Sequence, residues 1–208
     1  MTTRRQFLMA ASVSAIVSIG GCLNTIRSET ESARVETEII DVGEVPDVPV
    51  EFSVTQTSTI LSDEELPAFS VIIENEGDNT LWFQNGRPRV FSPGLSTPRG
   101  FYILSESEAT SVEDGTSDVS PAEPTDCLWI EHPPARPADE PQVTLEPGEP
   151  ESQNFAYAPD EDVNGERCPE PGEYAFQEEY RFYTEGQDER DEPQYLAEWG
   201  FTVRVHED

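Results

Sequence analysis

The chain has 208 residues, of which 43 are acidic and 12 are arginine, so its formal net charge is −31; lysine is absent. This charge argues against nucleic acid as a partner, because binding nucleic acid requires Lys and Arg to neutralise phosphates. It also excludes a purely electrostatic attachment to anionic lipid. At about 1 M salt the Debye length is about 3 Å, and self-repulsion within such a chain nearly vanishes. The composition therefore suits a protein that stays soluble in concentrated brine.

The N-terminal segment has the three parts of a secretory signal. Arg4 and Arg5 precede an apolar run over residues 7–19, and small residues precede Cys22. The run is shorter than the roughly 18 to 20 apolar residues needed to span a bilayer. We therefore expect residues 1–21 to be a cleaved export signal and not a permanent transmembrane helix.

Two motifs in this leader resemble known export signals. The paired arginines followed by Gln-Phe-Leu resemble a twin-arginine signal, and Ile-Gly-Gly before Cys22 resembles a lipobox, where the signal is cut and the new N-terminal cysteine is lipidated. Together with the acidic composition, the leader resembles those of exported lipoproteins of halophilic archaea. The resemblance implies a lipid on Cys22 that holds the protein to the outer face of the cell membrane, at about 0.8 kcal/mol per buried methylene. Residues 22–34 would be the lipidated cysteine and a polar tether.

Residues 35–208 show the period of two that marks half-buried strands. Val50, Phe52 and Val54 alternate with polar residues, and the same alternation recurs at 69–73 and 199–206. Strands are expected at 35–41, 50–55, 69–73, 81–83, 89–91, 101–104, 128–130, 143–145, 153–157, 174–182 and 199–205. No window has apolar residues at convincing helical spacing. We interpret 106–126, which is rich in Ser, Glu, Asp and Thr, and 184–193 as solvated loops. This pattern predicts an all-β, antiparallel sandwich.

One motif narrows the expected sandwich. Pro-Gly-Glu-Tyr at 171–174 opens a predicted strand, which resembles immunoglobulin-like domains, where a tyrosine near the start of strand F makes a corner hydrogen bond. Tyr174 is the candidate for this role. The resemblance implies an immunoglobulin-like β-sandwich in general architecture, although no cysteine follows two residues after Tyr174 as it does in antibody domains.

Cys127 and Cys168 are the two cysteines that remain once Cys22 is lipidated. Outside the cytoplasm such a pair is expected to form a disulfide. A loop of about 40 residues closed in this way stabilises a fold by up to about 4 kcal/mol on the chain-entropy model. The competing interpretation, a thiolate metal site, lacks a second cysteine pair.

The sequence lacks the residue sets of common catalytic sites. The mature chain has two histidines, His132 and His206, no methionine for a blue-copper site and no Gly-x-Ser-x-Gly elbow. Pairs of carboxylates carry little information among 43 acids. We therefore expect a non-catalytic protein, and an extracellular hydrolase of unknown type remains an alternative.

The segment 160–166 matches the opening of an EF-hand calcium loop, with Gly165 at the position that allows the turn. The candidate ligands carry side-chain oxygens and are Asp160, Asp162, Asn164 and Glu166. The match ends at Pro171, where the loop would need a bidentate glutamate. A calcium-binding or calcium-stabilised surface domain is therefore an alternative function.

Residues 79–105 contain no acid at all, in a chain where acids are otherwise frequent. Two interpretations remain open. Either these are central strands whose aromatic residues form the core, or they form a recognition face for a cell-surface protein or an anionic glycan. The candidate binding residues are Arg87, Arg89, Arg99 and Trp82. The function that fits all these features is a lipid-anchored, non-catalytic binding or structural module on the extracellular face of the membrane.

Overall fold

The computed structural model describes residues 34–84, 91, 100–118, 127–131, 142–165 and 167–206. They lie within one compact unit, Ser32–Asp208. The elements in chain order are β1 Val35–Val42, β2 Val50–Ser58, β3 Ile60–Leu61, β4 Ala68–Asn75, β5 Leu81–Gln84, β6 Phe101–Ser105, α1 Glu106–Glu113, β7 Gln142–Leu145, β8 Pro150–Pro159, α2 Glu161–Asn164, β9 Gly172–Thr184 and β10 Tyr195–Val205. Neither of the described helices is long and apolar enough to cross a membrane.

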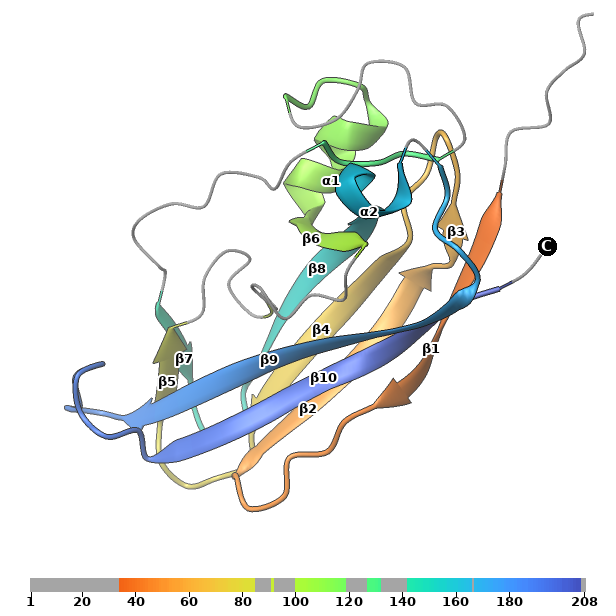
Figure 1. Ribbon diagram of the computed structural model, residues 1–208. Coiled ribbons are helices and arrows are strands. Elements are labelled where there is room, and N and C mark those ends of the chain that lie inside the picture. Colours follow the sequence, from red (N-terminus) through yellow and green to blue (C-terminus); the bar gives the residue numbers. More distant parts are fainter. Residues whose placement is uncertain are drawn as a thin grey trace, which may run out of the picture. The chain divides into compact units, whose positions relative to one another are not determined.

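The strands form two antiparallel sheets (Figure 1). One has six strands in the order β3-β1-β10-β9-β5-β7, and the other has four in the order β2-β4-β8-β6. A long ladder joins β9 to β10, from Gly172 opposite Val205 to Phe182 opposite Tyr195. The short strands β5 and β7 extend the six-stranded sheet at the C-terminal end of β9, where Trp82 pairs with Tyr183. The predicted all-β, antiparallel class is confirmed.

Apolar and polar residues alternate along several strands, and the apolar positions of that pattern are the buried ones. Along β4, Phe69, Val71 and Ile73 are fully buried while the residues between them are half-buried. Along β10, Phe201 and Val203 point the same way into the core. Because side chains of a strand alternate between its faces, β4 and β10 each bury one apolar row in the core.

The apolar rows of the two sheets meet in one core. Phe52 of β2 stacks on Trp199 of β10 with ring centroids 4.8 Å apart, and Phe69 of β4 meets Phe201 edge to face at 5.0 Å. Phe91 is fully buried and lies 6.4 Å from Phe69 and 5.3 Å from Phe201. These rings from both sheets show that the sheets pack face to face.

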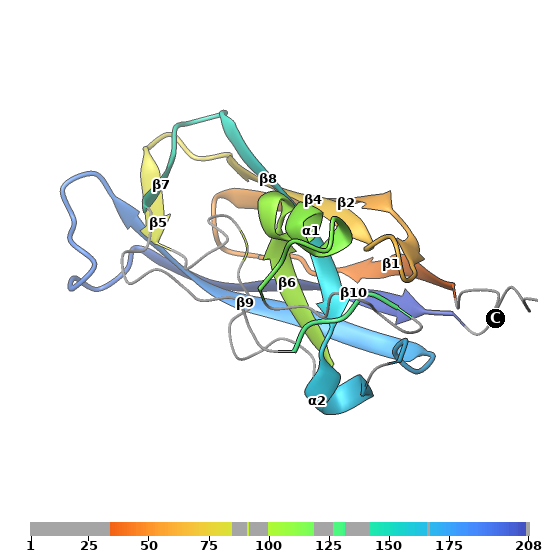
Figure 2. The same ribbon diagram turned by 90° about the horizontal axis from the view of Figure 1, so that it is seen from above.

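The predicted loop at 106–126 is wrong in its first part, which forms α1. The carboxylate of Glu108 accepts hydrogen bonds from the backbone N–H and the hydroxyl of Ser105, at 2.8 and 2.7 Å. This Ser-x-x-Glu spacing is the signature of a helix start. Only Ala109 and Val112 are buried, where α1 lies against β6 and β8 (Figure 2). Two apolar residues are too few for a visible helical period, so the cap was the only available signal.

The predicted strand at 128–130 is also wrong, because only Ile130 makes a bridge, an isolated parallel one with Asp160. The backbone N–H of Leu128 donates to the carbonyl of Ser62, and that of Ile130 donates to the carbonyl of Pro159. The side chains of this segment are buried, so their apolar character reflects the core although no ladder forms.

Candidate binding site at Trp82

Trp82 lies on the outer face of the six-stranded sheet. Its neighbours in β5, Leu81 and Phe83, belong to the core between the sheets, so the alternation turns the indole to the opposite face. The register places Trp82 opposite Thr144 of β7 on one side and Tyr183 of β9 on the other. Trp82 is nevertheless only 8% exposed and Tyr183 only 5%. Another part of the chain must therefore cover this aromatic pair.

One segment that contacts the pair is the connection between β9 and β10, residues 185–194. The rings of Trp82 and Tyr183 stack with centroids 4.4 Å apart and an angle of 19° between their planes. The indole Nε1–H donates to the carbonyl of Thr184 at 3.1 Å, and the Tyr183 hydroxyl donates to the carbonyl of Glu189 at 3.2 Å. The polar groups of both aromatic residues are thus paired with backbone carbonyls, one at the last residue of β9 and one in the middle of the connection.

Side chains within the connection hold its shape. Oε1 of Gln187 accepts hydrogen bonds from the N–H and the hydroxyl of Thr184 at 2.8 and 3.0 Å, while its Nε2 donates to the carbonyl of Glu192. The carboxylate of Asp191 accepts from the N–H of Asp188 at 2.7 Å. These local bonds are turn-forming and leave the connection as an ordered wall beside Trp82.

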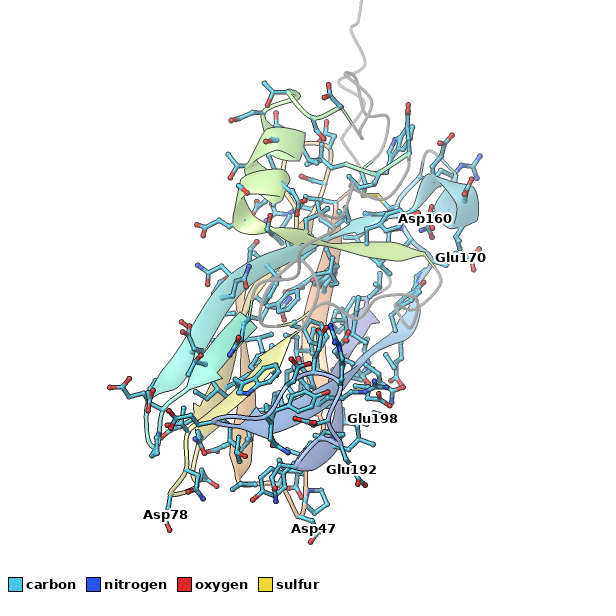
Figure 3. The ribbon with its side chains drawn as sticks, turned by 90° about the vertical axis from the view of Figure 1, so that its left-hand side faces the viewer. Asp47, Asp78, Asp160, Glu170, Glu192 and Glu198 are labelled. Atoms are coloured by element: carbon cyan, nitrogen blue, oxygen red, sulfur yellow. A yellow bond between two sulfur atoms is a disulfide. The ribbon has the colours of Figure 1, made fainter. Side chains whose placement is uncertain are left out.

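An open hollow of about 690 Å³ lies beside this wall. Its volume falls in the range of small-molecule sites, about 300 to 1,000 Å³. The lining residues come from β5, β7, their flanking turns and the connection, and are Thr80, Trp82, Gln142, Thr144, Glu146, Glu185, Gly186, Gln187, Asp188 and Glu189. Figure 3 faces this side, and its labelled Asp78 and Glu192 project at the same end of the domain.

The lining is acidic and rich in hydrogen-bond acceptors. Its carboxylates are Glu146, Glu185, Asp188 and Glu189, and none of the described lining residues is basic. The hydroxyl of Thr80 donates to Oε2 of Glu146 at 2.7 Å, which orients that carboxylate at the rim. Acceptors and negative charge beside an aromatic wall suit a ligand that donates hydrogen bonds or carries positive charge.

Trp82 is the predicted binding residue that the structure describes. Arg87, Arg89 and Arg99 lie outside the described residues, so the arginine face stays a prediction. Phe91, from the same acid-free stretch, is fully buried. The stretch thus contributes to the core at Phe91 and to a surface hollow at Trp82. The sequence prediction groups Trp82 with arginines, whereas the charged residues in the described lining of the hollow are acidic.

The four carboxylates of the hollow were not predicted from sequence. No local signal separates Glu146 or Glu185 from the other acids, because acids occur throughout the chain. Only the pairing of β5 with β7 brings Glu146 next to Thr80, 66 positions away.

The candidate calcium loop is a short helical turn in the structure. Oδ1 of Asp160 accepts from the N–H of Asp162 at 2.9 Å and so caps α2. The side-chain amide of Asn164 donates to the carbonyl of Gly100 at 2.7 Å. Glu166 lies outside the described residues, and among those described no three His, Cys, Asp or Glu side chains converge to hold a metal. Calcium binding here stays a prediction.

Two further sequence predictions concern the start of β9. Cys127 and Cys168 form the predicted disulfide, with Cα atoms 5.1 Å apart. The hydroxyl of Tyr174 donates to the carbonyl of Glu170 at 2.7 Å, which is the expected backbone bond a few residues upstream. Burial, and then the negative charge of Glu170, raise the pKa of Tyr174. The lipidation site, Cys22, lies outside the described residues.

Comparison of the chain with models of known protein families, with curated proteins and with solved structures finds no match. The function is therefore argued from the residues and the geometry of the domain.

Proposed function

We propose that this protein is a lipid-anchored, non-catalytic binding module on the extracellular face of the cell membrane, and that the hollow at Trp82 is its recognition site. The observation that carries the binding role is the stacked pair of Trp82 and Tyr183, held on an outer sheet face beside a polar hollow. Concave sites that combine aromatic side chains with a few oriented polar groups are typical of ligand recognition. The ordered connection at 185–194 supports a preformed site.

The location is supported by the leader and by the cysteines. Arg4 and Arg5 with the lipobox at Cys22 specify export and lipidation. The disulfide between Cys127 and Cys168 is stable in an oxidising compartment and is rare in the cytosol. The acidic, lysine-free composition supports adaptation to high salt. The anchoring partner would be membrane lipid through Cys22.

We further propose that the domain has an immunoglobulin-like architecture. The order β2-β4-β8-β6 corresponds to strands A-B-E-D of such domains, and β10-β9-β5 corresponds to G-F-C. Tyr174 near the start of β9 then occupies the position of the strand F tyrosine. The departures are that β7 pairs with β5 although it follows β6 in the chain, and that the disulfide lies outside the strands. In this architecture the hollow lies at one end of the sandwich, where the loops of immunoglobulin-like domains bind ligands.

The anchoring is tested by fractionating cells of a host that lipidates exported proteins. The wild-type chain should remain with the membrane and be degraded by protease added to intact cells, whereas Cys22→Ser should be released into the medium. Replacing Arg4 and Arg5 by lysine provides the control, because it should keep the uncut chain inside. A wild-type protein found in the cytosol with its leader attached would refute the proposal.

A further inference from the structure

We infer that the Trp82 hollow binds a positively charged side chain, Arg or Lys, presented by a partner protein. This inference rests on the proposed function of the hollow and names the class of its ligand.

The first step is the balance of charge around the hollow. Among its described lining residues only Asp188 lies within salt-bridge distance of a cation, the exposed Arg190 at 3.8 Å. The partner of Glu146 is the neutral hydroxyl of Thr80. Within the described part of the chain, the negative charge of the lining is therefore not balanced by basic side chains, which favours a cationic ligand over an anionic or neutral one.

The second step is the Trp82 ring, which lines the hollow although Trp82 is only 8% exposed. Stacking on Tyr183 and the bond from Nε1 to Thr184 hold the Trp82 ring in one orientation. A guanidinium or ammonium group in the hollow would contact the small exposed part of this ring and form charge-assisted hydrogen bonds with the carboxylates beside it. Because the ring is already fixed, binding costs little additional side-chain entropy.

The third step is the edge of the sheet. β7 is the last strand of the six-stranded sheet, and its outward residues Gln142 and Thr144 line the hollow. An extended segment that adds to an exposed strand places alternate side chains on the same face. A basic residue of such a segment would reach the hollow from β7, which favours a protein partner over a free small cation.

The fourth step concerns salt. At about 1 M salt, charges separated by more than about 3 Å are screened, so the diffuse negative surface cannot select a partner. Direct contact with carboxylates and an aromatic ring is screened much less. The hollow is thus a place where charge can still provide specificity in brine.

The experiment uses the full chain in detergent micelles at about 1 M NaCl, with the peptide acetyl-Gly-Arg-Gly-amide as the probe. The matched peptide carries citrulline, which has the shape of arginine without its charge. The indole N–H signals of Trp82, Trp129 and Trp199 are followed by NMR. We expect saturable shifts of the Trp82 signal with the arginine peptide, steady signals from the other two, and at least tenfold weaker binding of the citrulline peptide.

Variants of the hollow separate contact from general charge. Glu146→Gln with Glu185→Gln should weaken binding of the arginine peptide at least tenfold. The control, Glu64→Gln with Glu170→Gln, makes the same charge change at exposed acids elsewhere and should weaken binding less than twofold. Unchanged Trp199 signals show that the variants are folded.

The outcomes distinguish this inference from the proposed function. If both peptides shift Trp82 equally, the hollow remains a binding site but the cationic ligand is refuted. If the control pair weakens binding as much as the hollow pair, general charge explains the effect and the inference is refuted. If neither peptide shifts Trp82, both the cationic ligand and the recognition role of the hollow are refuted, whatever the result on anchoring.

Discussion

The hydroxyl of Tyr157 donates a 2.6 Å hydrogen bond to Oγ1 of Thr37 inside the core, and so joins β8 of one sheet to β1 of the other. Both residues have no exposed surface. Oγ1 of Thr37 donates to the carbonyl of Thr59 at 2.9 Å and accepts from Nε2 of Gln56 at 3.1 Å. Because buried polar groups need partners, this small network constrains how the two sheets lie against each other.

Tyr157→Phe should lower the free energy of unfolding by about 1 to 3 kcal/mol, because it removes the donor to Thr37 and leaves a buried oxygen with one partner fewer. Urea unfolding followed by circular dichroism measures the change. Tyr195→Phe is the control, since Tyr195 is only half-buried, and it should change stability by less than about 0.5 kcal/mol. Equal stability of wild type and Tyr157→Phe would contradict the role of this bond.

Raising the pH above about 10 should lower the free energy of unfolding, because two buried tyrosines can ionise only in the unfolded chain. Burial raises the pKa of Tyr157 above its ordinary value of 10, an effect that the Thr37 bond partly opposes, and burial followed by the charge of Glu178 raises that of Tyr180. The unfolded chain releases these protons from about pH 10, whereas the folded chain keeps them. Stability is therefore intact below about pH 10 and is lost as pH rises.

The loss can reach about 1.4 kcal/mol per pH unit for each tyrosine. Urea unfolding at several pH values between 9 and 12 (a range set by the reference pKa of about 10) measures it. Tyr157→Phe should show a shallower decline, because one of the two groups is missing. Parallel curves for the two proteins would contradict the prediction.

Removing the disulfide should lower stability by up to about 4 kcal/mol, because the unfolded chain gains the freedom of a long loop. The pair Cys127→Ala and Cys168→Ala tests this by thermal unfolding, with alanine chosen because Cys127 is fully buried. A reducing agent should lower the melting temperature of the wild type to about that of the variant. The same agent should leave the variant unchanged, and a shift there would point to another cause.

Gly200→Ala should destabilise the domain by at least about 3 kcal/mol, at the upper end of overpacking effects. A Cβ at Gly200 would overlap the carbonyl oxygen of Phe176 on the paired strand β9, and a backbone atom cannot rotate aside as the end of a flexible side chain can. Gly172→Ala is the matched control, since its Cβ would make only an ordinary contact of 3.7 Å with the Tyr174 ring. Similar melting temperatures for the two variants would refute the argument.

The melting temperature should rise between about 0.1 and about 1 M NaCl. With a formal net charge of −31, the folded chain repels itself more strongly than the expanded chain does, and salt screens this repulsion. Differential scanning calorimetry of the wild type measures the shift. A melting temperature that is constant or falls over this range would contradict adaptation to brine.

Much of the fold follows from the sequence alone, because the period of side chains along a strand is a local property. The predicted segments at β2, β4 and β10 match the structure for this reason. The disulfide was predicted on another ground, because Cys127 and Cys168 are the two cysteines that remain once Cys22 is lipidated. Tyr174 was identified from a short motif whose hydrogen bond is also local. Trp82 stood out because it is a large aromatic residue in an acid-free stretch.

The tertiary structure decided the rest. The start of α1 depends on the cap between Ser105 and Glu108, and its two buried residues gain an apolar surface only when β8 lies beneath them. The segment 128–130 is apolar because it packs, and sequence cannot distinguish packing from pairing there. The acidic character of the hollow came from the register of β5 with β7 and from the position of residues 185–189, which line the same hollow as Trp82. Among so many acids, only the pairing of distant strands determines which carboxylates share a site.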